Sequence, residues 1–424
     1  MNTIRLTLLL SLASATLLPT LAQTSREEVL ADLNKAGGVY LAYPAPTAQP
    51  TPTPKGYKPF YVSLYARHGS RYLLSDKDYK WVADVLDQAK EANVLTPLGL
   101  DALDRLNRIW PLVEGRGGDL SPLGERQHHD IALRLYNAYP DVFTSGRKVS
   151  ARSTLVPRCA MSMAAFTESL KTLVPTLNIR SEASQKYMSY LCYRTPESNH
   201  FTSHNTAPWA SDAQRFEAAL VQPDRLIKSL FTDLDYVAQH VDPARLMWGF
   251  YWVAADMQDI DSDISFHDLF TPDELFNVWQ VNNFRFYAGN ANHADSKGQV
   301  VASSKSLVQN ILQSADEAIA DNSIAATLRF GHDGNIIPLL ALMRIESFDA
   351  AVSRPEECFK VWSDFKASPM AANLQMIFFR NNRGDILVKF LHNEREVHIP
   401  IATDIFPFYH WADVRAYLEE IVNK

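Results

Sequence analysis

Cysteine is scarce in this sequence, which has three in 424 residues: Cys159, Cys192 and Cys358. Three cysteines allow one disulfide and leave one thiol over, and the sequence does not choose the pair. A chain of this length buries enough apolar surface to fold without a disulfide. A small scaffold held together by several disulfides is therefore excluded.

Spacings typical of metal ligands are also lacking among the 12 histidines and three cysteines. His128 and His129 are adjacent, but they fall in an expected helix, where neighbouring side chains point in different directions. A metal site built on this pair is not expected, and no other spacing predicts one. Internal repeats are absent as well.

Positive charge is in deficit, since 41 lysines and arginines face 48 aspartates and glutamates, for a formal net charge of -7. An acidic chain is a poor candidate for general nucleic-acid binding. Any anion that this protein binds must be held by a local cluster of cations. The 46% hydrophobic and 21% charged residues are typical of a folded globular protein.

Long apolar runs are missing except at the start of the chain. Arg5 precedes an apolar run at residues 6–13, and small residues follow before Ala22. This order predicts a signal peptide over residues 1–22. The run is short for a membrane span, and no cysteine follows it to carry a lipid. We expect an exported protein without a membrane anchor, either periplasmic or released, of undetermined oligomeric state.

Strand and helix patterns alternate in two separated parts of the chain, residues 23–175 and 301–424. Residues 43–59 are proline-rich and predict an extended surface loop. Residues 176–300 are rich in aromatics, Asp and Asn and predict a mostly helical insertion. The pattern as a whole predicts an α/β core with a helical cap. The expected strands are 60–66, 147–152, 325–330, 374–379 and 386–390, and the expected helices include 122–139, one beginning at Pro157, 212–220, 272–279, 336–343 and 411–422.

Charged clusters occur at three places where a strand ends and a helix or loop begins. The carboxyl ends of strands form the ligand crevice of open α/β sheets, and helix N-termini there attract anions. If the three clusters reach the same edge, four arginines, two histidines and one aspartate meet. They are Arg67, His68 and Arg71 in the stretch RHGSR, then Arg152 and Arg158, then His332 and Asp333 in the stretch GHDGN.

This set of side chains suits phosphoryl transfer. Arginine forks match phosphate oxygens in pairs and keep their charge at any working pH. Neighbouring arginines favour the neutral form of His68, which could then attack phosphorus through a ring nitrogen. Asp333 is the nearest acid for protonating the leaving alkoxide, and it must carry a proton to do so. The hypothesis predicts the best activity on the acid side of neutral.

Simpler interpretations exist for each cluster alone. Arginine–carboxylate pairs are common on surfaces, and His332 with Asp333 matches a loop histidine and a helix-capping aspartate. Cys159 beside Arg158 suggests a thiolate nucleophile, but the phosphate loop that such enzymes carry is absent. A non-catalytic phosphate-ester binding protein would need neither His68 nor Asp333. The signal peptide disfavours a cytoplasmic mutase.

Taken together, the motifs resemble those of the histidine acid phosphatases, the mostly secreted branch of the histidine phosphatase superfamily that includes phytases, glucose-1-phosphatases and multiple inositol polyphosphate phosphatases. RHGSR follows a strand, and GHDGN precedes an apolar helix more than two hundred residues later. Three further stretches agree along the chain: GDLSPLGERQHHDIALRLY, ARSTLVPRCAMSMAAF and MAANLQMIFFR. The family fold implies a central mixed sheet flanked by helices, with an inserted helical cap.

The resemblance implies a role for each matching residue. His68 corresponds to the nucleophile that becomes phosphohistidine, and Asp333 to the proton donor. The phosphate would be bound by Arg67, Arg71, Arg158 and His332. No metal or organic cofactor is implied, and the partner is a small phosphorylated substrate.

The substrate signals within the family point in two directions. Tyr72 after RHGSR is similar to the inositol polyphosphate phosphatase branch, whereas His332-Asp333 is similar to bacterial phytases and glucose-1-phosphatases. We expect an acid phosphatase for inositol phosphates such as phytate, with a glucose-1-phosphatase-like or broad acid phosphatase as the alternative. A multiply phosphorylated substrate needs more cations, so the candidate substrate-pocket residues are Arg152, Tyr72, Lys35, Lys77, Lys80 and Arg116.

Overall fold

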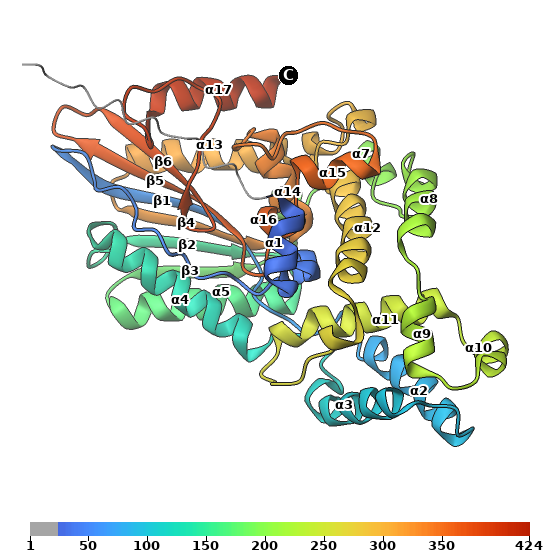
Figure 1. Cartoon of the computed structure of the whole chain (residues 1–424). Helices are drawn as coiled ribbons and strands as arrows, with labels where there is room; N and C mark the ends of the chain where they lie inside the picture. Colours follow the sequence, from blue (N-terminus) through green and yellow to red (C-terminus); the bar gives the residue numbers. More distant parts are fainter. Residues whose placement is uncertain (1–23) are drawn as a thin grey trace, which may run out of the picture.

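A computed structural model describes residues 24–424 of the chain (Figure 1). The predicted signal peptide, residues 1–22, lies outside this described part. Between residues 24 and 424, no helix combines the length and the apolar character needed to cross a bilayer.

The centre of the fold is one mixed sheet of eight strands. Its order is β3-β2-β4-β1-β5-β6-β7, with β8 beside β6. The first four strands in this order run parallel to one another, and β5 runs antiparallel to both of its neighbours, β1 and β6. The predicted α/β class is confirmed. The strands are β1 Tyr57–Arg67, β2 Lys148–Ser153, β3 Asn178–Ala183, β4 Ile324–Gly331, β5 Asn373–Asn381, β6 Ile386–His392, β7 Arg395–Glu396 and β8 Phe408–His410.

Strand β1 is buried on both faces because it lies in the middle of the sheet. Tyr61 and Tyr65 pack into one apolar cluster, while Val62 and Leu64 pack into another on the opposite face. The register pairs Arg67, the last residue of β1, with Gly331, the last residue of β4. The segments that follow these two strands therefore begin side by side.

Helices cover both faces of the sheet (Figure 1). On one face lie α4, Pro122–Ala138, and α5, Pro157–Leu173; on the other lie α13, Lys305–Ala320, and α17, Trp411–Asn423. Proline stands in the first turn of both α4 and α5, where its missing N–H costs nothing. Strand β4 runs directly into α14, Asp333–Leu342.

A second body, made of helices, stands beside the carboxyl ends of the parallel strands (Figure 1). One apolar cluster unites its members with the N-terminal segment. They are α2 Lys77–Glu91, α3 Pro97–Val113, α9 Asp224–Leu230, α11 Pro243–Asp256 and α12 Pro272–Asn290. The shorter helices are α1 Ser25–Ala31, α6 Met188–Leu191, α7 Pro196–His200, α8 Ala210–Leu220, α10 Leu234–His240, α15 Pro355–Val361 and α16 Asp364–Ala367.

Two groups of elements lie outside the part of the chain, core or cap, in which the sequence placed them. Strand β3 lies within residues 176–300 but pairs with β2 in the sheet. Helices α2 and α3 precede residue 176 but pack against α9 and α11. Both differences arise from long-range packing. Strand β3 pairs with β2 because a strand needs a hydrogen-bonded neighbour, and α2 and α3 bury their apolar faces against helices that come later in the chain.

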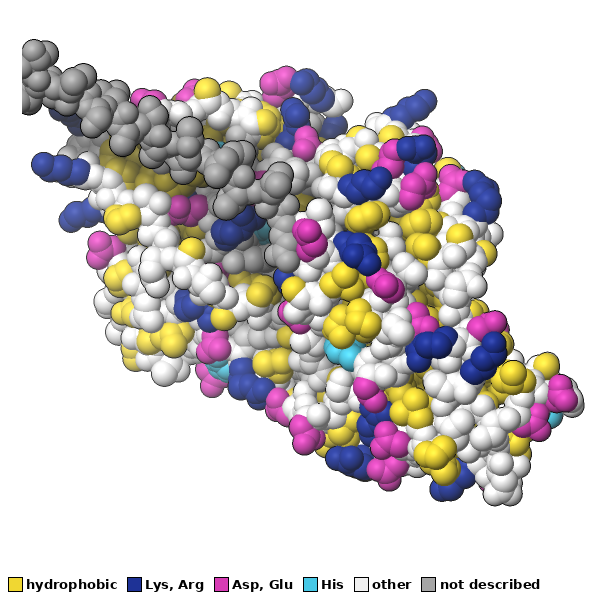
Figure 2. Space-filling view, viewed as in Figure 1, with side chains coloured by type: hydrophobic (Ala, Val, Ile, Leu, Met, Phe, Trp, Pro, Cys, Tyr) yellow, Lys and Arg dark blue, Asp and Glu magenta, His cyan; other side chains and the backbone are white. Residues whose placement is uncertain are grey.

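Charges are mixed on the face shown in Figure 2, where lysines and arginines alternate with aspartates and glutamates. On the part of this face that the described residues form and the view leaves uncovered, no broad patch of one sign dominates. The expectation that nucleic acid is not a partner stays a prediction from composition.

Candidate active site

A cavity of about 580 Å³ opens at the carboxyl ends of β1 and β4, between the sheet and the helical body. The residues expected to act on a phosphate line its inner end, and residues of α2, α11 and α12 line the rest. From the expected site it contains His68, Arg71, Arg158, His332 and Asp333.

His68 is the first residue after β1, and its side chain is buried. Its backbone N–H donates to the carbonyl of Gly331 at 3.0 Å, which fixes it beside the end of β4. Its ring Nδ1 lies 2.9 Å from the carbonyl oxygen of Gly69. A carbonyl only accepts, so Nδ1 carries the proton and Nε2 keeps a free lone pair.

Gly69 follows the histidine because the start of α4 comes very close. A Cβ at this position would lie 2.3 Å from the carbonyl oxygen of Gly124. The glycine therefore lets the loop after β1 turn against α4 while the His68 ring stays oriented.

His68 is held neutral. Burial lowers its pKa well below the ordinary value, and the positive charges of Arg67, Arg71 and Arg158 lower it further. A neutral imidazole with a free Nε2 is the form that can act as a nucleophile.

Three arginines surround this histidine, and each is anchored through part of its guanidinium. The Nη1 of Arg67 donates to the carbonyls of Val39 and Ser368, at 2.5 and 2.8 Å. Arg71 donates from Nη1 to the carbonyl of Tyr72 at 2.8 Å, and from Nη2 to the hydroxyl of Tyr40 at 3.0 Å. These bonds orient the guanidinium groups before any ligand arrives.

All three arginines keep an N–H donor that binds no acceptor of the protein between residues 24 and 424. Within the described part of the chain, the buried Nε atoms of Arg67, Arg71 and Arg158 have no hydrogen-bond partner. Arg71 and Arg158 line the cavity, whereas Arg67 is fully buried and does not. Buried donors without partners are rare in folded proteins, and guanidinium groups at one cavity suit an anion with several oxygens. The cluster is therefore suited to a phosphate group.

A polar network behind the loop holds it in place. The hydroxyl of Ser70 donates to Asp259 at 2.6 Å and accepts from Gln127 Nε2 at 2.8 Å. The Ser70 backbone N–H donates to Gln127 Oε1 at 2.9 Å. Gln127 belongs to the stretch that begins α4, so the sequence motif contained it, but Asp259 comes from the distant helical body and carried no such signal.

His332 ends the turn between β4 and α14 and faces His68, with 5.8 Å between the ring centroids. Its Nε2 lies 3.1 Å from the hydroxyl of Thr154. Burial lowers its pKa to about 4; Asp333 opposes this effect, and Arg158 adds to it. His332 is therefore a neutral group at mildly acid pH.

Asp333 is the first residue of α14 and remains partly exposed to the cavity. Its Oδ2 lies 3.0 Å from Arg67 Nη2, and its Oδ1 accepts from the Gly334 N–H at 2.7 Å. Burial pushes the pKa of Asp333 upward, but Arg67, His332 and Arg71 together outweigh burial and lower it. Asp333 is thus ionised until another negative charge enters the cavity.

Cys159 lies in this region but is not a nucleophile. Its thiol is buried and donates to the carbonyl of Gly331 at 3.2 Å. Burial raises its pKa to about 12, so the thiolate is absent at working pH. Cys192 and Cys358 are also free thiols, and no disulfide forms among the three. Cys159 does not line the cavity, and its buried position disfavours the thiolate interpretation of Arg158-Cys159.

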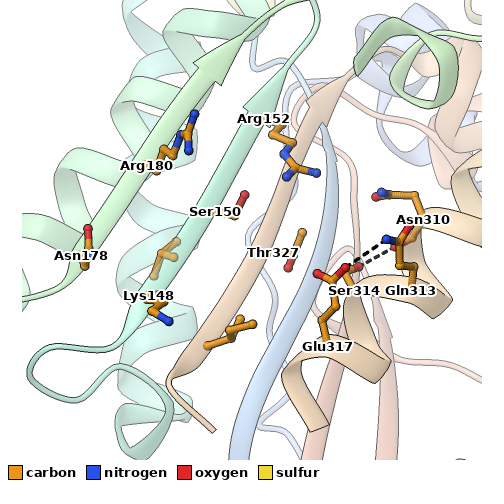
Figure 3. A pocket seen from close by; sticks show the side chains of 12 residues that line it. Lys148, Ser150, Arg152, Asn178, Arg180, Asn310, Gln313, Ser314, Glu317 and Thr327 are labelled. Carbon is orange, nitrogen blue, oxygen red and sulfur yellow. Dashed lines mark hydrogen bonds between the residues drawn. The ribbon is translucent and has the colours of Figure 1, made fainter. Parts of the chain in front are cut away.

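Arg152 does not reach the cavity with His68. It lies in a second cavity of about 370 Å³ on the sheet, together with Lys148 and Arg180 (Figure 3). Its Nη1 donates to the hydroxyl of Tyr190 at 3.0 Å, and its guanidinium lies 4.6 Å from the ring centroid of Tyr187. Although Arg152 is the penultimate residue of β2, its side chain lines the second cavity and not the cavity with His68.

The other candidate substrate-pocket residues also do not line the cavity. Lys35 and Lys80 pair with Glu28 and Asp84, and Lys77 is exposed at the start of α2. Arg116 pairs with Asp119 at 3.3 Å and stacks on the ring of buried Tyr72, 4.6 Å from its centroid. Local carboxylates pair with Lys35, Lys80 and Arg116, whereas Lys77 is exposed outside the cavity.

Residues that the sequence reasoning missed form the wider part of the cavity. They are mainly aromatic and come from the helical body: Trp81 of α2, Trp248 and Trp252 of α11, and Phe286 of α12, with Arg245 beside them. The aromatic enrichment of residues 176–300 was the available signal, but it does not tell which rings face a cavity. Between residues 24 and 424, no group of three His, Cys, Asp or Glu side chains is placed to hold a metal ion.

Comparison with known proteins agrees with this architecture. The family model of the histidine phosphatase superfamily (branch 2) matches residues 61–393. The chain is 21% identical over 398 residues to multiple inositol polyphosphate phosphatase 1 of Gallus gallus, covering 89% of this chain and 85% of that protein.

Two solved structures share the fold. The multiple inositol polyphosphate phosphatase of Bifidobacterium longum, in complex with inositol hexasulfate, superposes with a TM-score of 0.75 at 16% identity, covering 91% of this chain and 97% of that one. The phytase of D. castellii superposes with a TM-score of 0.71 at 16% identity, covering 97% and 89%.

Proposed function

The chain belongs to branch 2 of the histidine phosphatase superfamily and is a phosphoric monoester hydrolase, and we propose that its substrates are inositol phosphates, the class that includes phytate. The observation that carries the proposed mechanism is the orientation of His68. Its Nδ1 proton is bound to Gly69, so Nε2 is free among three arginines that have unpartnered donors, with Asp333 nearby.

The reaction has two steps. The Nε2 lone pair of His68 forms a bond to phosphorus while the bond from phosphorus to the ester oxygen breaks, and Asp333 gives its proton to the departing alkoxide. A water molecule then attacks the phosphohistidine, Asp333 takes a proton from it, and the N–P bond breaks to release phosphate. Arg67, Arg71, Arg158 and His332 bind the phosphoryl oxygens in both steps.

Asp333 can serve as an acid only after the substrate binds. Arg67 lowers its pKa in the open cavity, whereas a phosphate dianion beside it raises the pKa and also occupies the arginines. Acid pH favours its protonated form, while the lowered pKa of His68 keeps the nucleophile neutral there. The geometry thus supports an acid phosphatase.

The substrate class is supported by relatives whose names refer to inositol polyphosphates or phytate. Phosphate release from phytate, glucose 1-phosphate and p-nitrophenyl phosphate at acid pH separates this proposal from a glucose-1-phosphatase-like or broad acid phosphatase. Negligible turnover of phytate and of every lower inositol phosphate, alongside brisk hydrolysis of glucose 1-phosphate, would reject it.

The decisive test of mechanism is to trap the phosphoenzyme. The protein is mixed with a phosphate-labelled substrate, quenched in acid and assayed for protein-bound label. We expect label in the wild type and in His129→Ala, a matched histidine on α4 that does not line the cavity. His68→Ala should carry none. Label that persists in His68→Ala would show that another residue is the nucleophile, and would leave the fold and family unchanged.

Export is a further part of the proposal, based on the predicted signal peptide at residues 1–22. Sequencing the N-terminus of the mature protein tests it. A start near Gln23 supports export, and a mature protein that still begins with residues 1–5 contradicts it.

A further inference from the structure

The wide part of the cavity is an aromatic wall that is continuous with the phosphate cluster. The guanidinium of Arg71 lies 4.6 Å from the ring centroid of Tyr40, which lies 5.6 Å from Trp252. Trp252 in turn stacks on Trp248, at 5.9 Å and an interplanar angle of 23°. A ring that enters the cavity attached to the bound phosphate therefore meets aromatic side chains first.

A third tryptophan extends this wall. Trp81 of α2 packs directly against α11, where Gly249 makes room for it: a Cβ at residue 249 would lie 2.5 Å from Trp81 Cζ2. Trp81, Trp248 and Trp252 all remain partly exposed and line the cavity. Exposed tryptophan surface in a concave site is a favourable contact for the apolar face of a ligand.

Of residues 24–424, one arginine brings positive charge to the wide part of the cavity. Among the lining residues, the lysines and arginines are Arg71, Arg158 and Arg245, and the first two belong to the phosphate cluster. The Arg245 guanidinium lies over Trp81, 4.5 Å from its ring centroid, and within residues 24–424 it forms no ion pair with a carboxylate, although the Arg245 backbone N–H donates to Asp242 at 3.0 Å. Its charge is therefore available to a ligand.

The other polar side chains that line the wide part of the cavity are negatively charged or neutral. Asp78 lines the cavity near Trp81. His204 also lines it, but burial and the neighbouring Arg285 lower its pKa, which favours the neutral ring. A fully phosphorylated inositol would place several phosphates against tryptophans and this aspartate, and phosphates without cationic partners are costly to desolvate.

From this distribution we propose that the wide part of the cavity binds the ring face of a partly phosphorylated inositol, with Trp248 and Trp252 against the ring and Arg245 on one further phosphate. The oxygens of inositol project mostly outward, so the two ring faces present C–H groups that suit the negative faces of tryptophan rings. The proposal rests on the proposed function and narrows it: the enzyme prefers inositol phosphates with few phosphates to the hexakisphosphate.

The first test compares substrates on the wild-type protein. kcat/KM is measured at one acid pH for an inositol monophosphate, an inositol bisphosphate, inositol hexakisphosphate and glycerol 2-phosphate, which has no ring. We expect the bisphosphate to exceed the hexakisphosphate by about tenfold or more, the scale of one well-placed pocket contact. A kcat/KM for the hexakisphosphate equal to or above that for the bisphosphate would overturn the proposal.

The second test removes the additional phosphate contact. Arg245→Ala should lower kcat/KM for the bisphosphate by about tenfold, mainly through KM, and leave the monophosphate and glycerol 2-phosphate nearly unchanged. Arg108→Ala on α3 is the matched control, since Arg108 is exposed and outside the cavity. An equal loss with all three substrates, or none with the bisphosphate, would contradict the role of Arg245.

The third test removes the ring contact. Trp252→Ala should lower kcat/KM for every inositol substrate by about tenfold but spare glycerol 2-phosphate, and Trp252→Phe should retain most of the activity. A loss that is as large with glycerol 2-phosphate would mean that Trp252 acts through Tyr40 and Arg71 rather than on the ring. Failure of the proposed function is distinguishable, because then none of the inositol phosphates is hydrolysed while p-nitrophenyl phosphate still is.

Discussion

The two ends of one cavity are built on different principles. The inner end comes from segments that follow β1 and β4 and from the start of α5, and it is buried, charged and pre-oriented by backbone carbonyls. The wide end comes from α2, α11 and α12, and it is aromatic, partly exposed and nearly free of charge. In the proposed function, the strand ends carry the chemistry and the helical body selects the alcohol that carries the phosphate.

Replacing the acid tests this division most strongly. Asp333→Asn cannot give a proton to a leaving alkoxide, so kcat for inositol phosphates and glycerol 2-phosphate should fall by about 10² to 10⁴. p-Nitrophenolate leaves without a proton, so its ester should lose less than about tenfold. Initial rates with both ester types measure this. Equal losses would contradict the proton-donor role, and thermal unfolding checks that Arg67 without its partner does not unfold the protein.

Removing one phosphate contact should affect all substrates alike. Arg158→Ala loses donors that face the reacting phosphoryl group, so kcat should fall by about 10² to 10³ with every ester, whatever its alcohol. Arg158→Lys should recover part of the activity because the charge remains. A loss confined to ring substrates would place Arg158 with the wide end of the cavity and break the comparison.

The same variant should also move the pH profile. Arg158 is one of the charges that lower the pKa of His68, so its removal raises that pKa and lets the imidazole take a proton at higher pH. The acid limb of kcat/KM for p-nitrophenyl phosphate should therefore shift to higher pH in Arg158→Ala, relative to wild type measured over the same range. An unchanged limb, or a shift to lower pH, would show that His68 does not control it.

The smallest effect is expected outside the cavity. Arg152→Ala removes the contacts of this arginine with Tyr187 and Tyr190, so kcat/KM should stay within about twofold and stability should fall by about 0.5–1 kcal/mol. Steady-state kinetics and thermal unfolding measure both. A loss of activity above tenfold at unchanged stability would connect the second cavity with catalysis.

Much of the inner end could be predicted from sequence because its signals are local. A β-favouring segment that stops at Arg67, a strand that stops before His332 and a proline that begins α5 before Arg158 each mark a strand or helix end. Parallel neighbours bring such ends to the same edge, and the register of Arg67 with Gly331 shows this. The chemical character of these side chains then predicts phosphate binding.

The substrate-facing cations could not be predicted in the same way. Lys35, Lys80 and Arg116 have a suitable charge, but each lies beside a carboxylate that is close in space. Arg245 and the tryptophans carried no distinguishing motif, and their position depends on the packing of α2 against α11. The pairs Lys80–Asp84 and Arg116–Asp119 have spacings of four and three residues that the sequence contains, but the packing of α2 against α11 is not visible in it.

The sequence by itself determined the fold class and most residues of the inner end, because strand ends, helix starts and residue chemistry are encoded in short contiguous segments. Only the tertiary structure decided which face of the helical body meets the substrate, since that depends on contacts between residues more than a hundred positions apart, such as Trp81 and Gly249. The physical reason is that the sequence of an amphipathic helix determines which of its faces is apolar. Which side chains stay exposed beside that face depends on the shape and charge of the element that packs against it.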